Sequence, residues 1–125
     1  MTVTLLGTTY EVKLPSQFAI REELVVAYDA AGANFSQRQR VLGAVLGLCT
    51  DIGKESKFDF VRARFDVLGY GGAVYGYLRE KGASMADVAT QGSPIVAKME
   101  ADLFPREAEV AAQAGFTGAT AGPTE

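Results

Sequence analysis

The sequence predicts a mainly α-helical fold in which an N-terminal β-hairpin packs on a bundle of about five helices. In residues 2–14 apolar and polar side chains alternate, which is the period of a strand. From residue 16 onward the apolar side chains recur every three or four residues, which is the period of a helix. At 125 residues, the chain is expected to form one globular domain over residues 1–114, followed by a flexible tail over residues 115–125.

The first element, Thr2–Leu14, is predicted to be the hairpin, with its turn near Gly7. An isolated two-stranded sheet is only marginally stable in water. The hairpin should therefore either lay its apolar face on the helices or pair with another chain. Because free strand edges are templates for strand pairing, we expect the hairpin to be required for oligomerisation or for docking.

Caps mark the first two helices. Ser16 is expected to cap a helix over residues 17–31, which Gly32 ends. Asn34, with a glutamine three residues later, has the form of a capping box. It predicts a second helix that ends near Cys49.

This second helix is expected to be the most buried one, and it carries Gly43 and Gly47 one turn apart. Because glycine lowers helix stability by up to about 1 kcal/mol, the pair is expected to let a neighbouring backbone approach closely. A ligand on the bare surface is the alternative. Cys49 ends an apolar run, and we expect it to be a small buried hydrophobic residue in a reducing compartment rather than a reactive thiol.

The middle of the chain is predicted to contain a polar connection over Thr50–Lys57 and a short helix over Phe58–Phe65. Asp66 is expected to cap a glycine-rich helix over residues 67–81, which Gly82 ends.

Three further helices are predicted in the last third of the chain. A capping box at Ser84 predicts a short helix over residues 85–91, which Gly92 ends. Pro94 is expected to open the next helix, because proline is favoured at the first helical position. A last helix is expected over residues 106–114.

The composition argues against catalysis and metal binding. With no histidine and one cysteine, a single chain can assemble neither a zinc site nor an EF-hand loop. Three carboxylate pairs are available, but each is expected at a solvated helix face or a cap rather than in a hydrolytic site: Glu22 with Glu23, Asp59 with Asp66, and Glu107 with Glu109. We therefore expect a protein that is not an enzyme and has no cofactor and no metal.

Binding of a protein partner is the function that this composition favours. Tyr70, Tyr75 and Tyr77 in the glycine-rich helix, and Phe116 in the tail, are the candidate partner-binding residues. The competing interpretations are that the tyrosines are partly buried core residues and that Phe116 anchors the tail on the chain's own surface. Twelve basic against fifteen acidic residues give a net charge of -3, which disfavours a partner bound through phosphates.

A nucleic-acid alternative comes from residues 78–99. Two capped helices joined at Gly92 resemble the opening of a helix-turn-helix. The second of them, however, offers one basic residue, Lys98, and none of the arginine, asparagine or glutamine side chains that contact base edges. A DNA-binding regulator is therefore the weaker alternative.

The order of these elements also carries a family resemblance. A strand pair is followed by the segments 18–24, 40–49 and 70–75, and then by Leu78 and Gly82. Over roughly residues 1–114 this arrangement resembles the tail assembly chaperones and related small tail-module proteins of bacteriophages. Such a chaperone coats the long hydrophobic tape measure protein and recruits tail tube subunits, without a cofactor and without catalysis.

The resemblance implies a homo-oligomeric chaperone that binds a tape-measure-like helical partner and tail tube subunits in the bacterial host cytoplasm. A virion structural protein, such as a connector or tail-completion subunit, is the alternative. The acidity and aromatic content further suggest that the bound segment is amphipathic and basic and is held largely through apolar contact. No run approaches the ~20 apolar residues of a membrane span, and no charged leader opens the chain, so we expect a soluble protein without a membrane partner.

Overall fold

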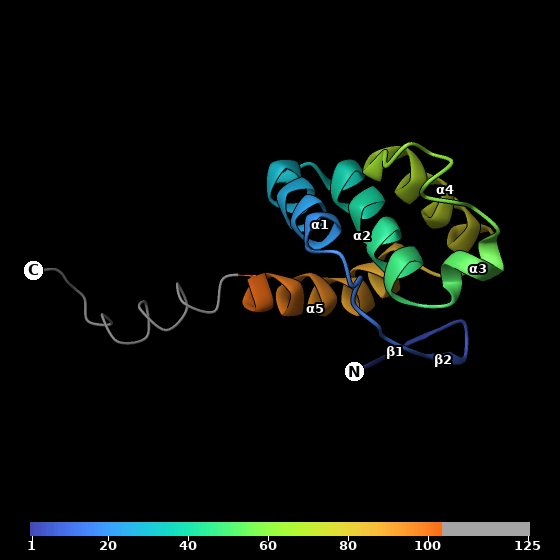
Figure 1. The fold of residues 1–125 in the computed structure, drawn as a ribbon. Coiled ribbons are helices and arrows are strands. Elements are labelled where there is room, and N and C mark those ends of the chain that lie inside the picture. The colour runs from blue at the N-terminus through green and yellow to red at the C-terminus, as the bar shows by residue number, and fades with distance from the viewer. Residues whose placement is uncertain (104–125) are drawn as a thin grey trace, which may run out of the picture.

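The computed structural model describes residues 1–103, and within them it confirms a mainly helical fold with an N-terminal hairpin (Figure 1). The expected helix over residues 106–114, the tail over residues 115–125 and Phe116 lie outside this described part. The elements in chain order are β1 (Thr2–Leu5), β2 (Thr8–Glu11), α1 (Phe18–Ala31), α2 (Phe35–Cys49), α3 (Ile52–Ser56), α4 (Val67–Glu80) and α5 (Met85–Leu103).

Helix α2 is the centre of the molecule. It contacts α1, α3, α4 and α5, and Figure 1 shows α1 on one side of it and α4 on the other. Every residue from Val41 to Gly47 is buried, so this helix has no solvent-exposed face over two turns. Such an all-round buried surface is what its run of apolar and small residues favours.

Glycines set the close crossing of α2 and α4. A Cβ atom added to Gly71 would overlap the carbonyl oxygen of Arg40, and one added to Gly43 would overlap the carbonyl oxygen of Gly71. A Cβ atom at Gly47 would lie 2.5 Å from the hydroxyl oxygen of Tyr70. The close approach of a neighbouring backbone is thereby confirmed for Gly43, whereas at Gly47 the neighbour is the side chain of Tyr70.

The hairpin packs on the helices. Its strands pair antiparallel, with Val3 opposite Tyr10, and it buries Val3, Leu5 and Tyr10 in the core. At the outer edge of β1, the amide of Thr4 donates a hydrogen bond to the side-chain oxygen of Gln91 in α5 (2.9 Å). Because this contact covers part of the edge, β1 is less open to strand pairing than the sequence suggested. A role of the hairpin in oligomerisation stays a prediction.

Three local predictions were wrong. Helix α1 begins after Gln17, without a side-chain cap, so Ser16 is not the N-cap. The segment predicted as a polar connection contains α3, where Thr50 accepts a hydrogen bond from the amide of Ile52 (3.1 Å) and Ile52 is fully buried. Residues 58–65 form turns instead of a helix, because Arg64 and Phe65 have a φ of 59°, outside the right-handed helical region.

The pair of helices predicted around Gly92 is also wrong, because α5 continues unbroken from Met85 to Leu103 with Pro94 inside it. Gly92 is buried, and its Cα faces the side chain of Leu42 in α2. Packing against α2 therefore outweighs the local stop signals of glycine and proline. This continuity also removes the turn that a helix-turn-helix over residues 78–99 would need.

Candidate protein-binding groove

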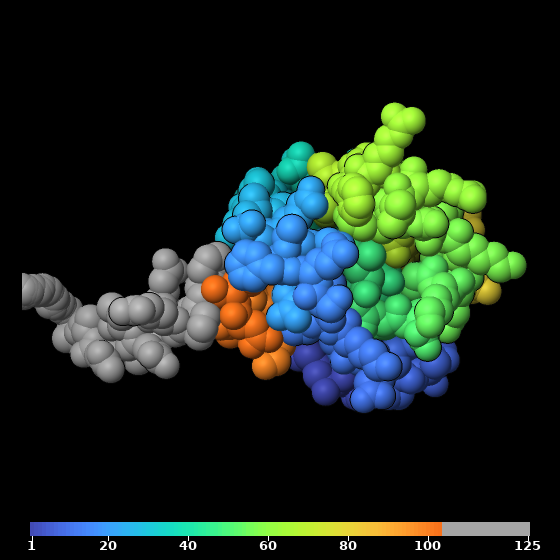
Figure 2. Space-filling view, viewed as in Figure 1, coloured from blue at the N-terminus to red at the C-terminus, as the bar shows by residue number. Residues whose placement is uncertain are grey.

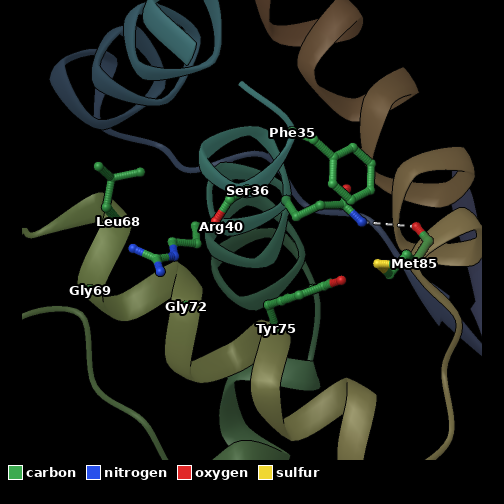
Figure 3. A pocket seen from close by; sticks show the side chains of 9 residues that line it. Phe35, Ser36, Arg40, Leu68, Gly69, Gly72, Tyr75 and Met85 are labelled. Atoms are coloured by element: carbon green, nitrogen blue, oxygen red, sulfur yellow. Dashed lines mark hydrogen bonds between the residues drawn. The ribbon is translucent and has the colours of Figure 1, made fainter. Parts of the chain in front are cut away.

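A groove with a volume of about 540 Å³ lies where α2, α4 and the first turn of α5 meet (Figure 3). Helix α2 contributes its first two turns, α4 residues between Leu68 and Tyr75, and α5 its first residue. The lining residues are Phe35, Ser36, Gln39, Arg40, Leu68, Gly69, Gly72, Tyr75 and Met85.

The rim of the groove is apolar and open to water. Phe35 is 54% exposed and Met85 is 45% exposed, although both are large apolar residues. Leu68 and Tyr75 are half-buried beside them, and in Figure 3 the ring of Tyr75 points toward Met85. Clustered apolar side chains in water are typical of a surface that binds another molecule.

Local structure places these side chains. The side chain of Asn34 accepts a hydrogen bond from the amide of Gln37 (3.0 Å), which fixes Phe35 as the first residue of α2. Ser84 accepts a hydrogen bond from the amide of Asp87 (3.0 Å), which does the same for Met85 and α5. Both predicted caps are thus present, and each holds an apolar side chain at the rim.

The floor of the groove is formed in part by glycine. A Cβ atom added to Gly72 would meet nothing closer than the side chain of Arg40, at 3.6 Å. A Cβ atom at Gly72 would therefore be in ordinary contact with the side chain of Arg40, in contrast to Gly71, where the backbone of α2 leaves no room for one. The two neighbouring glycines have different roles, one in helix packing and one in the shape of the groove.

Two polar side chains complete the site. The buried side chain of Gln39 donates a hydrogen bond to the carbonyl oxygen of Met85 (3.0 Å), drawn as a dashed line in Figure 3, and so ties α5 to α2. The exposed Arg40 extends toward Gly69 and Gly72 and, among residues 1–103, is the only charged side chain lining the groove. The groove is thus an apolar surface with a single positive charge.

The candidate tyrosines do not gather on one surface. Tyr70 is a core residue, 4% exposed, whose ring meets that of Phe60 edge-on at 5.3 Å. Burial raises the pKa of Tyr70 to about 12. Tyr75 lines the groove, whereas Tyr77 is half-buried with the ammonium of Lys81 5.4 Å from its ring centroid.

Phe35 and Met85 were not among the binding residues predicted from the sequence. Each stands directly after a helix cap, and Phe35 lies off the apolar stripe of its helix. A large apolar residue at the first position of a helix, away from the core-facing stripe, was the available signal.

The Cys49 thiol and the carboxylates of Asp59 and Asp66 have structural roles within the described residues. Cys49 is 1% exposed, and burial raises the pKa of its thiol to about 12, so the thiol stays protonated. The carboxylates of Asp59 and Asp66 accept hydrogen bonds from backbone amides of their own turns. Residues 1–103 contain no cluster of three potential metal ligands and no helix with the length and apolar character to cross a bilayer.

No protein-family model matches the sequence, and neither a curated protein nor a solved structure is significantly similar to the chain.

Proposed function

We propose that this chain is a non-catalytic assembly protein, of the kind found in phage tail modules, that holds an apolar helical segment of a partner protein in the groove of α2, α4 and α5. The observation that carries this proposal is the exposure of Phe35 and Met85 at the rim of one groove. The resemblance to tail assembly chaperones supplies the class of partner, a tape-measure-like helical protein, with tail tube subunits as further partners.

A helix is the segment that suits this surface. Amphipathic helices bind hydrophobic grooves through side chains spaced three or four residues apart. Met85 has a flexible thioether side chain that adapts to partners of different shape, and Phe35 and Tyr75 provide larger, stiffer contacts.

The charge of the groove refines the expected partner. Arg40 is its only charged lining residue within the described part of the chain, so a carboxylate on the bound helix is favoured at this position. The basic segment expected from the net charge of the chain does not suit this groove. Because most of the lining is apolar, affinity should rest on apolar contact and should change little with salt.

The test fills the groove. In Gly72→Leu the new side chain enters the groove from its floor, against the side chain of Arg40, and we expect it to weaken binding of a labelled leucine-rich helical peptide carrying one glutamate by at least about tenfold. Gly76→Leu is the matched control, since a Cβ atom there meets nothing within 4 Å and Gly76 does not line the groove. Fluorescence anisotropy at low and physiological salt measures both variants.

Equal affinity of the two variants would disprove the role of the groove. Binding of duplex DNA that collapses as salt rises would instead indicate a phosphate-dependent protein. Analysis of finished particles separates the two phage roles, because a chaperone is absent from them whereas a virion structural protein stays.

A further inference from the structure

The solvent face of α1 combines apolar side chains with negative charge. Phe18 is 60% exposed and Val26 is 58% exposed, and they lie on one stripe with Glu22, at intervals of four residues. Glu23 and Asp29 are exposed beside this stripe. Every charged residue on the exposed side of α1 is therefore acidic, and none of these carboxylates forms an ion pair within residues 1–103.

The loop over residues 57–66, which joins α3 to α4, combines apolar side chains with positive charge. Phe58, Val61 and Phe65 are 45%, 68% and 49% exposed. The same loop contains the exposed basic residues Lys57, Arg62 and Arg64, which form no ion pair within the described part of the chain. The two acidic residues of this loop already accept hydrogen bonds from backbone amides.

The backbone of the loop is held in an unfavourable conformation. Arg64 and Phe65 follow each other with a φ of 59°, a region that costs residues with a side chain about 1–2 kcal/mol each. Phe65 is nevertheless 49% exposed, and its ring meets that of Phe60 edge-on at 5.4 Å. Conformations of this kind persist where the surroundings over-determine them, and they cluster at binding sites.

We infer that the acidic face of α1 and the loop over residues 57–66 bind each other between two copies of this chain. The two surfaces are complementary in charge, because the free charges of α1 are negative and those of the loop are positive. Both surfaces also expose apolar side chains that water-free contact would bury. Figure 2 shows α1 in blue and the loop in light green, both on the face turned toward the viewer. The groove of α2, α4 and α5 adjoins this face at Gly69, but its apolar rim at Phe35 and Met85 lies outside both surfaces.

A hollow beside the loop gives the contact a specific shape. It has a volume of about 330 Å³ between the loop and α4, with Phe58, Arg62, Tyr70 and Ala73 among its lining residues. The hollow has room for a phenyl ring, and the exposed ring of Phe18 on a second copy supplies one. In this arrangement Glu22 of that copy comes close to Arg62, which adds an ion pair to the apolar contact.

Charge reversal tests the contact. Sedimentation at low salt should show that the parent self-associates and that Glu22→Lys with Asp29→Lys weakens this association by at least about tenfold. Arg62→Glu with Arg64→Glu should have the same effect. Glu11→Lys with Glu80→Lys, on exposed residues outside both surfaces, causes the same change in net charge as the α1 variant and should leave association unchanged.

Mixing the two reversed variants is the decisive measurement. In an equimolar mixture, each reversed surface meets an oppositely charged partner, so association should return although each variant alone is monomeric. A parent chain that stays monomeric at millimolar concentration, reversed variants that associate like the parent, or a mixture that stays monomeric would each overturn the inference. Circular dichroism melting curves that match the parent show that the variants are folded.

Discussion

At Gly71, a single hydrogen atom in place of a side chain lets α4 lie against α2. A Cβ atom there would overlap the carbonyl oxygen of Arg40, so Gly71→Ala must push the two helices apart. We expect this substitution to lower the free energy of unfolding by about 1–3 kcal/mol. Urea denaturation followed by circular dichroism measures it.

Gly76 on the same helix is the matched control at the residue scale. It is exposed, and a Cβ atom there meets nothing within 4 Å. Gly76→Ala should therefore raise the free energy of unfolding by about 0.5–1 kcal/mol, because alanine favours the helix. If both alanine substitutions changed the free energy of unfolding in the same direction, the close crossing of α2 and α4 at Gly71 would be contradicted.

At the scale of the element, Pro94 distinguishes one long helix from two short ones. Inside α5 it removes a backbone hydrogen bond and crowds the preceding turn, whereas at the start of a separate helix it would be favourable. Because α5 is continuous and Pro94 is exposed, Pro94→Ala should stabilise the protein by about 1–3 kcal/mol. Thermal unfolding measures this, and a destabilised variant would support two helices.

At the scale of the whole molecule, two buried ionisable groups, the Cys49 thiol and the Tyr70 hydroxyl, make the free energy of unfolding depend on pH in the alkaline range. Burial raises the pKa of Cys49 from 9.0 to about 12 and that of Tyr70 from 10.0 to about 12. Above pH 9 the folded chain therefore binds more protons than the unfolded chain, and the free energy of unfolding falls as the pH rises toward 12. Below pH 9 the contribution of both groups is fully present.

Urea denaturation at a series of pH values checks this dependence. Cys49→Ala removes the thiol, so its free energy of unfolding should fall less steeply between pH 9 and pH 12 than that of the parent, whatever the effect of the substitution at neutral pH. Equal slopes would mean that the thiol ionises as readily in the folded chain as in the unfolded one.

Features that depend on neighbours in the chain were predictable. The periods of two and 3.6 residues indicated the hairpin and the main helices, and Asn34 and Asp66 cap their helices through a side-chain oxygen that accepts a hydrogen bond from the amide three residues later. Gly43 and Gly47 indicated a close crossing because glycine in a buried helix needs a packing reason. Of the candidate site, the sequence identified Tyr75, which lines the groove.

Features that depend on residues far apart in the chain were decided by the tertiary structure. Leu42 packs on Gly92 and helps keep α5 whole, and the full burial of Ile52 favours a helical α3 in a segment whose composition suggests a loop. The groove exists because α2, α4 and α5 meet, which leaves Phe35 and Met85 exposed together. Local propensities amount to tenths of a kcal/mol per residue, whereas burying one large side chain contributes about 1.5–3 kcal/mol, so packing decides wherever the two disagree.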